Sequence, residues 1–141
     1  MPQRVYRVCR SRWAMLDGEG ARRVGARWNS PGRSIVYMAD SISLAVLENL
    51  VHLSRQDFPT GYVVIAAVIP DSLAILSLDE LANPQAGGDQ WFDSQASAAL
   101  RVSSVVVPAE FNFLLNPAHP DFQRIVVEPA TPFNFDSRLF A

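Results

Sequence analysis

The chain has 141 residues, of which 49% are hydrophobic and 18% charged, with a formal net charge of −2. This length and composition fit one compact domain with its own core, and they exclude a disordered chain. No apolar run is long enough to span a bilayer, the single cysteine excludes an internal disulfide, and no His/Cys cluster has metal-ligand spacing. We therefore expect one cytoplasmic domain over residues 1–141 without a metal.

The basic residues are unevenly distributed. All twelve are arginine, and eight of them fall within the first 33 residues. Against two carboxylates they give this segment a charge of +6, while four arginines against twelve carboxylates give the remainder −8. A GC-rich genome explains the choice of arginine but not the clustering. Because guanidinium groups suit bidentate contacts with phosphate or carboxylate, we expect a phosphorylated ligand or an acidic partner rather than nucleic acid.

The first half of the chain predicts two strands and one apolar helix. The expected elements are a strand at 4–9, a glycine-punctuated loop at 17–25, a turn at Ser30-Pro31-Gly32 and a strand at 34–39. Asp40-Ser41 offers capping chemistry for a helix that runs to about Ser54. Because ISLAVLENLVHL is apolar almost all round, we expect this helix to be buried on more than one side.

The second half predicts further strands. The β-branched run at 62–69, ended by Pro70, is typical of a central strand. The other expected elements are a strand at 74–78, a helical turn at 79–83, a surface loop at 83–89, weak helix at 93–101, a strand at 103–108, a helix beginning at Asn116-Pro117, and strands at 124–128 and 132–135. Together they predict an α+β fold with small mixed sheets around one buried helix.

Glu48 does not match the apolar character of its expected helix. Its neighbours three and four positions away are Leu44, Ala45, Val51 and His52, and three of the four are apolar. A carboxylate on such a face needs a cation or several hydrogen-bond donors. Two interpretations stay open: a structural ion pair or surface contact, and a catalytic carboxylate in an apolar-walled cleft.

Other candidate residues also have ordinary structural interpretations. Trp28 is more often a core aromatic than a ligand platform, and Tyr37 shares a strand face with Ile35, which favours packing. Neither Ser103 nor Ser104 lies in a G-x-S-x-G context. The chain also lacks a G-x-G-x-x-G motif and a phosphate loop, so any nucleotide must be held by another arrangement.

Three separated stretches resemble a known family. GARWNSPGRSIVYMADSISLAVLENLVH resembles the opening signature of the RES domain, a toxin family named for its arginine, glutamate and serine. ALRVSSVVVPAEFNFLLNPAHPDF resembles its second signature and PFNFDSRLF its closing strand, so the resemblance extends from Arg4 to Phe140. By position the motif residues fall on Arg27, Tyr37, Glu48 and Ser104, with Ser103 as the alternative serine because the usual Val-Pro pair is replaced by Val102-Ser103.

The resemblance implies a fold similar to ADP-ribosyltransferases, with NAD as substrate and no metal. It implies the toxin of a type II toxin–antitoxin module, which consumes NAD by cleaving the nicotinamide–ribose bond through hydrolysis or phosphorolysis. Some members are similar instead to mono-ADP-ribosyltransferases that modify a host metabolic protein. The implied partner is an antitoxin with an Xre-type helix-turn-helix, which covers the active site and supplies the only contact with nucleic acid. No membrane contact is expected.

The residues suit this chemistry. Cleavage of the nicotinamide–ribose bond passes through an oxocarbenium-like state, which the carboxylate of Glu48 can stabilise. Ser104 can donate a hydrogen bond to Glu48 or to the ribose, and the guanidinium of Arg27 can hold the pyrophosphate. The resemblance places the substrate contacts on Arg27, Trp28, Asn29 and Tyr37. The alternative from another functional class is a module that binds a nucleotide or partner without turnover.

Overall fold

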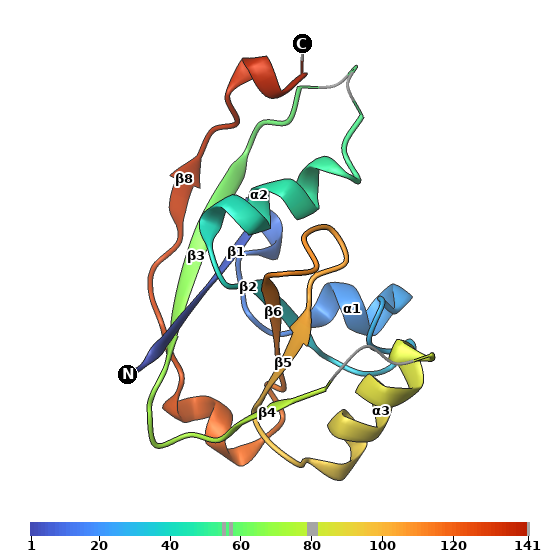
Figure 1. Ribbon diagram of the computed structural model, residues 1–141. Helices are drawn as coiled ribbons and strands as arrows, with labels where there is room; N and C mark the ends of the chain where they lie inside the picture. The colour runs from blue at the N-terminus through green and yellow to red at the C-terminus, as the bar shows by residue number, and fades with distance from the viewer. Residues whose placement is uncertain (55, 57, 79–81, 141) are drawn as a thin grey trace.

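One curled mixed sheet organises the chain. The computed structural model describes residues 1–54, 56, 58–78 and 82–140. Its eight strands follow the order β4-β5-β6-β2-β1-β3-β7, with β8 also paired to β3, and the sheet bends into a half-barrel (Figure 1). The β4–β5 pair is parallel and the other pairs are antiparallel. The α+β prediction is confirmed, whereas the expectation of several small sheets around one buried helix is wrong.

The described elements are eight strands, three α-helices and three short 3-10 helices. The strands are β1 (Gln3–Arg10), β2 (Val36–Ala39), β3 (Tyr62–Ile69), β4 (Ile75–Ser77), β5 (Ala99–Ser103), β6 (Phe111–Leu115), β7 (Val126–Val127) and β8 (Thr131–Phe133). The helices are α1 (Glu19–Val24), α2 (Ile42–Leu50), α3 (Pro84–Ser94), η1 (Ser11–Trp13), η2 (Pro120–Arg124) and η3 (Ser137–Phe140). None of the helices in these residues has the length and apolarity that crossing a membrane requires.

The sheet opens between β1 and β2. Strand β1 pairs with β3 residue for residue along its whole length. With β2 it shares a single register pair, Tyr6 opposite Ala39. Past that pair, the Arg7 guanidinium donates to the Tyr37 carbonyl oxygen at 3.2 Å in place of a backbone ladder. A groove lies between the two strands where the sheet opens.

Helix α2 lies on the sheet and is not enclosed by it. It begins as expected at Ser41, whose hydroxyl accepts a hydrogen bond from the backbone N–H of Leu44 at 3.1 Å. Leu44 and Ala45 are buried against β1 and β2, but Leu47 is 43% and Val51 59% exposed. The prediction that this helix is buried on more than one side is therefore wrong, because only one of its apolar sides faces a layer of protein (Figure 1).

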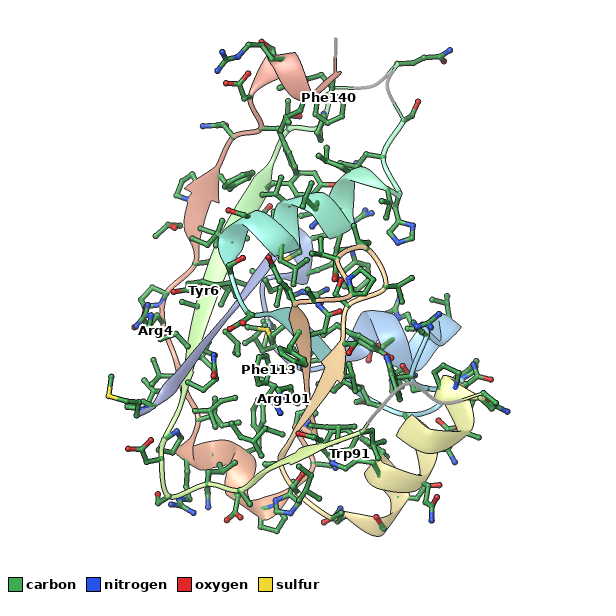
Figure 2. All side chains as sticks on the ribbon, viewed as in Figure 1. Arg4, Tyr6, Trp91, Arg101, Phe113 and Phe140 are labelled. Atoms are coloured by element: carbon green, nitrogen blue, oxygen red, sulfur yellow. The ribbon has the colours of Figure 1, made fainter. Side chains whose placement is uncertain are left out.

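Helix α3 replaces the surface loop expected at 83–89. The Asn83 side chain accepts from the N–H of Ala86 at 3.1 Å, and Pro84 occupies the first turn, where its missing N–H is not needed. Gly88 lies against the backbone of Trp28, because a Cβ at this glycine would be 1.7 Å from the Trp28 carbonyl oxygen. Trp91 of the same helix is buried between α3 and the sheet (Figure 2), in the same core cluster as Trp28. Gly88, which is part of the pattern that resembled a loop signal, instead permits close packing.

Of the other predicted elements, most strands are present in the structure, whereas several predicted loops and helices are not. The strands expected at 4–9, 34–39, 62–69, 74–78, 124–128 and 132–135 all contain or overlap a strand. Helix α1 lies in the expected loop 17–25, and β6 was not expected. The expected helix 93–101 holds only the end of α3, at Ser94, and the start of β5, at Ala99, and the expected strand 103–108 is a loop beyond Ser103. At Asn116-Pro117 a turn precedes η2, which begins only at Pro120. The helical turn expected at 79–83 falls mainly on residues 79–81, outside the described residues.

Candidate functional site

A groove follows the opening between β1 and β2 and continues past α2 to the loop that joins β5 and β6. One half, which we call the β1 half, has a volume of about 390 Å³ and lies between β1, η1, β2 and α2. The other, the loop half, has a volume of about 230 Å³ and lies between α2, residues 26–28 and the β5–β6 loop. Tyr37, Glu48 and His52 line both halves. Glu48 therefore lies at the junction of the groove.

The neighbouring Asn49 connects the last turn of α2 to β1. Its side-chain amide donates to the carbonyl oxygen of Val8 in β1 at 2.8 Å and to that of Ala45 at 2.9 Å. The amide thereby satisfies a β1 carbonyl at the place where the sheet opens. With Ala45 buried and Asn49 tied to β1, the intervening carboxylate is half-buried at the edge of the groove. Asn49 was not among the residues predicted from the sequence.

Ser104, not Ser103, contacts Glu48. The Ser104 hydroxyl donates to Glu48 Oε1 at 2.8 Å and is 2% exposed. It also accepts from the backbone N–H groups of Val106 and Val107, at 3.2 and 3.1 Å, which fixes the hydroxyl at the start of the β5–β6 loop. Ser103 is exposed and lines the loop half. A hydrogen bond to an ionised acceptor is among the stronger kinds, so Ser104 holds the carboxylate in one orientation.

Tyr37 contributes its ring to the groove, while its hydroxyl is occupied elsewhere. The hydroxyl donates to Asn29 Oδ1 at 2.7 Å and accepts from the N–H of Trp28 at 3.0 Å. Burial raises the pKa of Tyr37, which the hydrogen bond from Trp28 only partly offsets. The hydroxyl therefore stays protonated and cannot serve as a base at neutral pH.

Asn29 and Trp28 are buried beneath the groove. Asn29 is fully buried, and its amide donates to three backbone carbonyl oxygens, those of Ala21, Ser30 and Arg33. The structure therefore places Asn29 as a support for Tyr37 and for the turn, which differs from the substrate contact expected from the sequence. Trp28 is 5% exposed, lies in the same core cluster as Trp91, and is one of the residues that line the loop half.

Helix α3 holds the turn that carries Arg27. Asp89 accepts from the backbone N–H and the hydroxyl of Ser30 at 2.9 and 2.6 Å. Arg33 forms a bidentate pair with Asp93, with N–O distances of 2.8 and 2.7 Å. These contacts join residues about sixty positions apart and make the turn a rigid base for Arg27, which is exposed and lines the loop half.

The eight arginines of the basic segment divide into two sets. Four are paired with carboxylates: Arg4 with Glu128, Arg22 and Arg23 with Glu19, and Arg33 with Asp89 and Asp93. The other four line the groove, and the ion pairs among the described residues include none of them: Arg7, Arg10, Arg12 and Arg27. Because Glu48 is the only carboxylate among the described residues of either half, the groove favours an anionic ligand.

The β1 half also supplies aromatic surfaces. The Arg10 guanidinium lies 5.2 Å from the centre of the Tyr62 ring, and that of Arg12 lies 5.6 Å from the centre of the Trp13 ring. The sequence predicts Arg7, Arg10 and Arg12 only as members of a basic cluster, although their spacing along one strand and its extension is a signal that they lie near each other. No group of three or more His, Cys, Asp or Glu among the described residues is arranged to hold a metal ion.

Comparisons with known proteins agree on one family. The model of the RES domain matches residues 4–136. A protein of Sphingobium sp. (strain YBL2) named Prs ADP-ribosylating toxin is 39% identical over 88% of this chain and 86% of its own length. A protein of Photorhabdus laumondii subsp. laumondii named Toxin Res is 36% identical over 96% of both chains. In the crystal structure of the M. tuberculosis MbcT–MbcA toxin–antitoxin complex, one chain has the same fold, with a TM-score of 0.75 at 18% identity over 99% of this chain and 87% of that chain.

Proposed function

The chain belongs to the RES domain family, and on this basis we propose that it is the toxin of a type II toxin–antitoxin module and acts on NAD in the cytoplasm. We propose that it consumes NAD by cleaving the nicotinamide–ribose bond. The observation that carries this proposal is the half-buried carboxylate of Glu48, which Ser104 holds at 2.8 Å at the junction of a groove whose described lining includes four arginines. The anionic dinucleotide matches the charge of such a groove, and the reaction needs a fixed carboxylate.

Each residue has a separate role in this proposal. Glu48 stabilises the positive charge that develops on the ribose as the bond to nicotinamide breaks. Ser104 keeps the carboxylate in place, and the Tyr37 ring offers a flat surface at the same junction. The groove arginines hold the two phosphates, with Arg27 on the rigid turn of the loop half. Asn29 and Trp28 act through Tyr37 and the turn.

Substitution of Arg27 by lysine is expected to impair turnover although the charge is kept. Lysine lacks the planar fork that binds two phosphate oxygens at once. Loss of one hydrogen bond to a charged group corresponds to about 1.5–3 kcal/mol, so kcat/KM for NAD should fall about tenfold or more. Steady-state rates of nicotinamide release measure this effect.

A matched control for that variant is Arg22→Lys. Arg22 lies on α1, is exposed, and pairs with Glu19 at 2.6 Å, and neither residue is among the described lining residues of the groove. It should retain wild-type kinetics. If Arg27→Lys is equally active, only net charge matters at this position and the bidentate contact is wrong.

The acceptor of the ADP-ribosyl group separates two candidate reactions. Hydrolysis or phosphorolysis leaves only small products, whereas transfer modifies a host protein. The second reaction is favoured by one observation: the Sphingobium relative, 39% identical, is named Prs ADP-ribosylating toxin. Incubation of the protein and a cell extract with adenylate-labelled NAD decides between them. Label on a macromolecule supports transfer, and label confined to small products supports NAD degradation.

The cognate partner in this proposal is an antitoxin with an Xre-type helix-turn-helix that covers the groove. The groove rim carries exposed apolar side chains beside its arginines: Val51 is 59%, Val105 57% and Val106 36% exposed. A partner segment that combines apolar residues with carboxylates would match this rim. Contact with nucleic acid would come only through the antitoxin.

We expect the antitoxin to compete with NAD. Because its acidic segment would occupy the same arginines as the dinucleotide, the concentration needed for half-inhibition should rise as NAD rises. Rates of NAD cleavage measured against antitoxin concentration, at several NAD levels, test this directly. Inhibition that is unchanged at saturating NAD would place the antitoxin elsewhere and overturn the groove-blocking proposal.

A further inference from the structure

We propose that His52 is the base that takes the proton from the acceptor of the ADP-ribosyl group. The inference rests on the proposed cleavage of NAD and adds the residue that completes the transfer. The acceptor class is a neutral O–H group, either water or a hydroxyl of a protein.

The position of His52 carries the argument. It follows Glu48 by one helical turn, in the turn that ends α2, where its N–H donates to the carbonyl oxygen of Asn49 at 3.0 Å. His52 is exposed and lines both halves of the groove, as do only Glu48 and Tyr37 among the described residues. An imidazole at this place lies next to the reacting centre and remains open to an acceptor arriving from solvent.

The other titratable groups of the groove are unsuited to this task. Arginine side chains stay protonated in proteins. Cys9 is 6% exposed, and its thiol donates to the Trp13 carbonyl oxygen at 3.5 Å. Tyr62 is 7% exposed beneath the Arg10 guanidinium, and the Tyr6 hydroxyl accepts from Arg4 Nε at 3.3 Å. Burial raises the pKa of Tyr37, whose proton is already donated to Asn29. Glu48 is held by Ser104 and must stay charged to stabilise the ribose. Histidine is the side chain that ordinarily exchanges a proton between about pH 5 and 8.

Charged and titratable groups face His52 from each element around the groove. They are Glu48 on α2, Tyr6, Arg7, Cys9 and Arg10 on β1, Arg12 on η1, Tyr37 on β2, Tyr62 on β3 and Arg27 on the turn before β2. Glu48 is the only carboxylate among these described groups, so it is the group that can stabilise the positive charge on His52 once the proton has been taken.

The C1′–N bond breaks and its electron pair goes to the nicotinamide nitrogen, which leaves as a neutral ring. The acceptor oxygen then forms a bond to C1′, and its proton passes to the free ring nitrogen of His52. The imidazolium afterwards returns the proton to solvent. The reverse reaction, in which nicotinamide recombines with the ribosyl cation, involves no proton and needs no base.

This difference gives a sharp test with His52→Gln. Purified protein is incubated with NAD, labelled free nicotinamide and a cell extract, and two rates are followed: ADP-ribosyl transfer to water plus macromolecules, and exchange of labelled nicotinamide into NAD. Removal of a general base commonly lowers a rate by about 10²–10⁴-fold. We expect transfer to fall by about 10²-fold while exchange continues at the wild-type rate. The rise of wild-type transfer with pH should also disappear, and added imidazole should restore transfer in His52→Ala.

The other histidine supplies the control. His119 caps η2 by accepting from the N–H of Asp121 at 3.0 Å and is not among the lining residues of the groove. His119→Gln should therefore leave the ratio of transfer to exchange unchanged. Wild-type transfer and pH dependence in His52→Gln would overturn the proposal, and so would an equal fall of transfer and exchange, which indicates a role in binding. Absence of nicotinamide release from the wild-type protein would instead refute the proposed function itself.

Discussion

Glu48→Gln is expected to abolish cleavage of NAD while the fold stays intact. The amide has nearly the same shape as the carboxylate, and its oxygen can still accept the hydrogen bond that Ser104 donates at 2.8 Å. What disappears is the negative charge that stabilises the oxocarbenium-like state. Loss of one such electrostatic contact corresponds to about 3 kcal/mol or more, a fall of about 10²–10³-fold in kcat. Initial rates of nicotinamide release measure it, and thermal unfolding should show an unchanged Tm.

Glu110→Gln is the matched control for this variant. Glu110 is an exposed carboxylate at the end of the same loop that carries Ser104, and it is not among the described lining residues of the groove. Its substitution should leave the rate unchanged. Full activity of Glu48→Gln would remove the carboxylate from the mechanism and leave it with a structural role only.

Gly88→Ala is expected to produce the largest loss of stability. A Cβ at this position would lie 1.7 Å from the carbonyl oxygen and 2.7 Å from the carbonyl carbon of Trp28. Both atoms belong to the backbone, so the contact can be relieved only by moving α3 away from the turn. Overpacking commonly costs about 1–3 kcal/mol and occasionally more, and we expect about 3 kcal/mol or more here. Urea unfolding measures the change in the free energy of unfolding.

The same substitution in α1 gives a clear contrast. Gly20 is a helical glycine with no atom within 4 Å of an added Cβ. Because the helix propensity of alanine exceeds that of glycine by about 0.8–1.0 kcal/mol, Gly20→Ala should stabilise the protein slightly.

Gly88→Ala should also lower the rate of NAD cleavage, because the displaced turn carries Arg27. Wild-type stability of Gly88→Ala would show that α3 does not hold this turn in place.

Much of the fold could be predicted from local signals. The β-branched run of β3 and the Ser41 cap of α2 are local features, and both were located correctly. Helix α3 was not, because the glycine that marks it as a loop reflects a contact with Trp28, sixty residues earlier in the chain. The exposure of Leu47 and Val51 likewise depends on which side of α2 the sheet covers, and residue pattern alone does not determine this.

In the candidate site, too, the residues of a local motif could be predicted, whereas contacts between distant parts of the chain could not. The sequence placed Glu48 and Ser104 together through a family motif, and the hydrogen bond between them agrees with that placement. It could not separate the arginines, since their partners lie far along the chain: Arg4 pairs with Glu128, 124 positions away. Only the folded chain distinguishes these paired arginines from the four that line the groove. Asn29, adjacent to Trp28 in the motif, turns inward because its amide satisfies backbone carbonyls.

Release of nicotinamide by the purified wild-type protein tests the central proposal most directly. We expect the amount released from excess NAD to exceed the amount of protein many times over, because a glycosyl-transferring enzyme turns over. The competing interpretation is a module that binds a nucleotide without reacting. NAD that binds the groove but is recovered intact after prolonged incubation with a cell extract, with no nicotinamide released, would contradict the account.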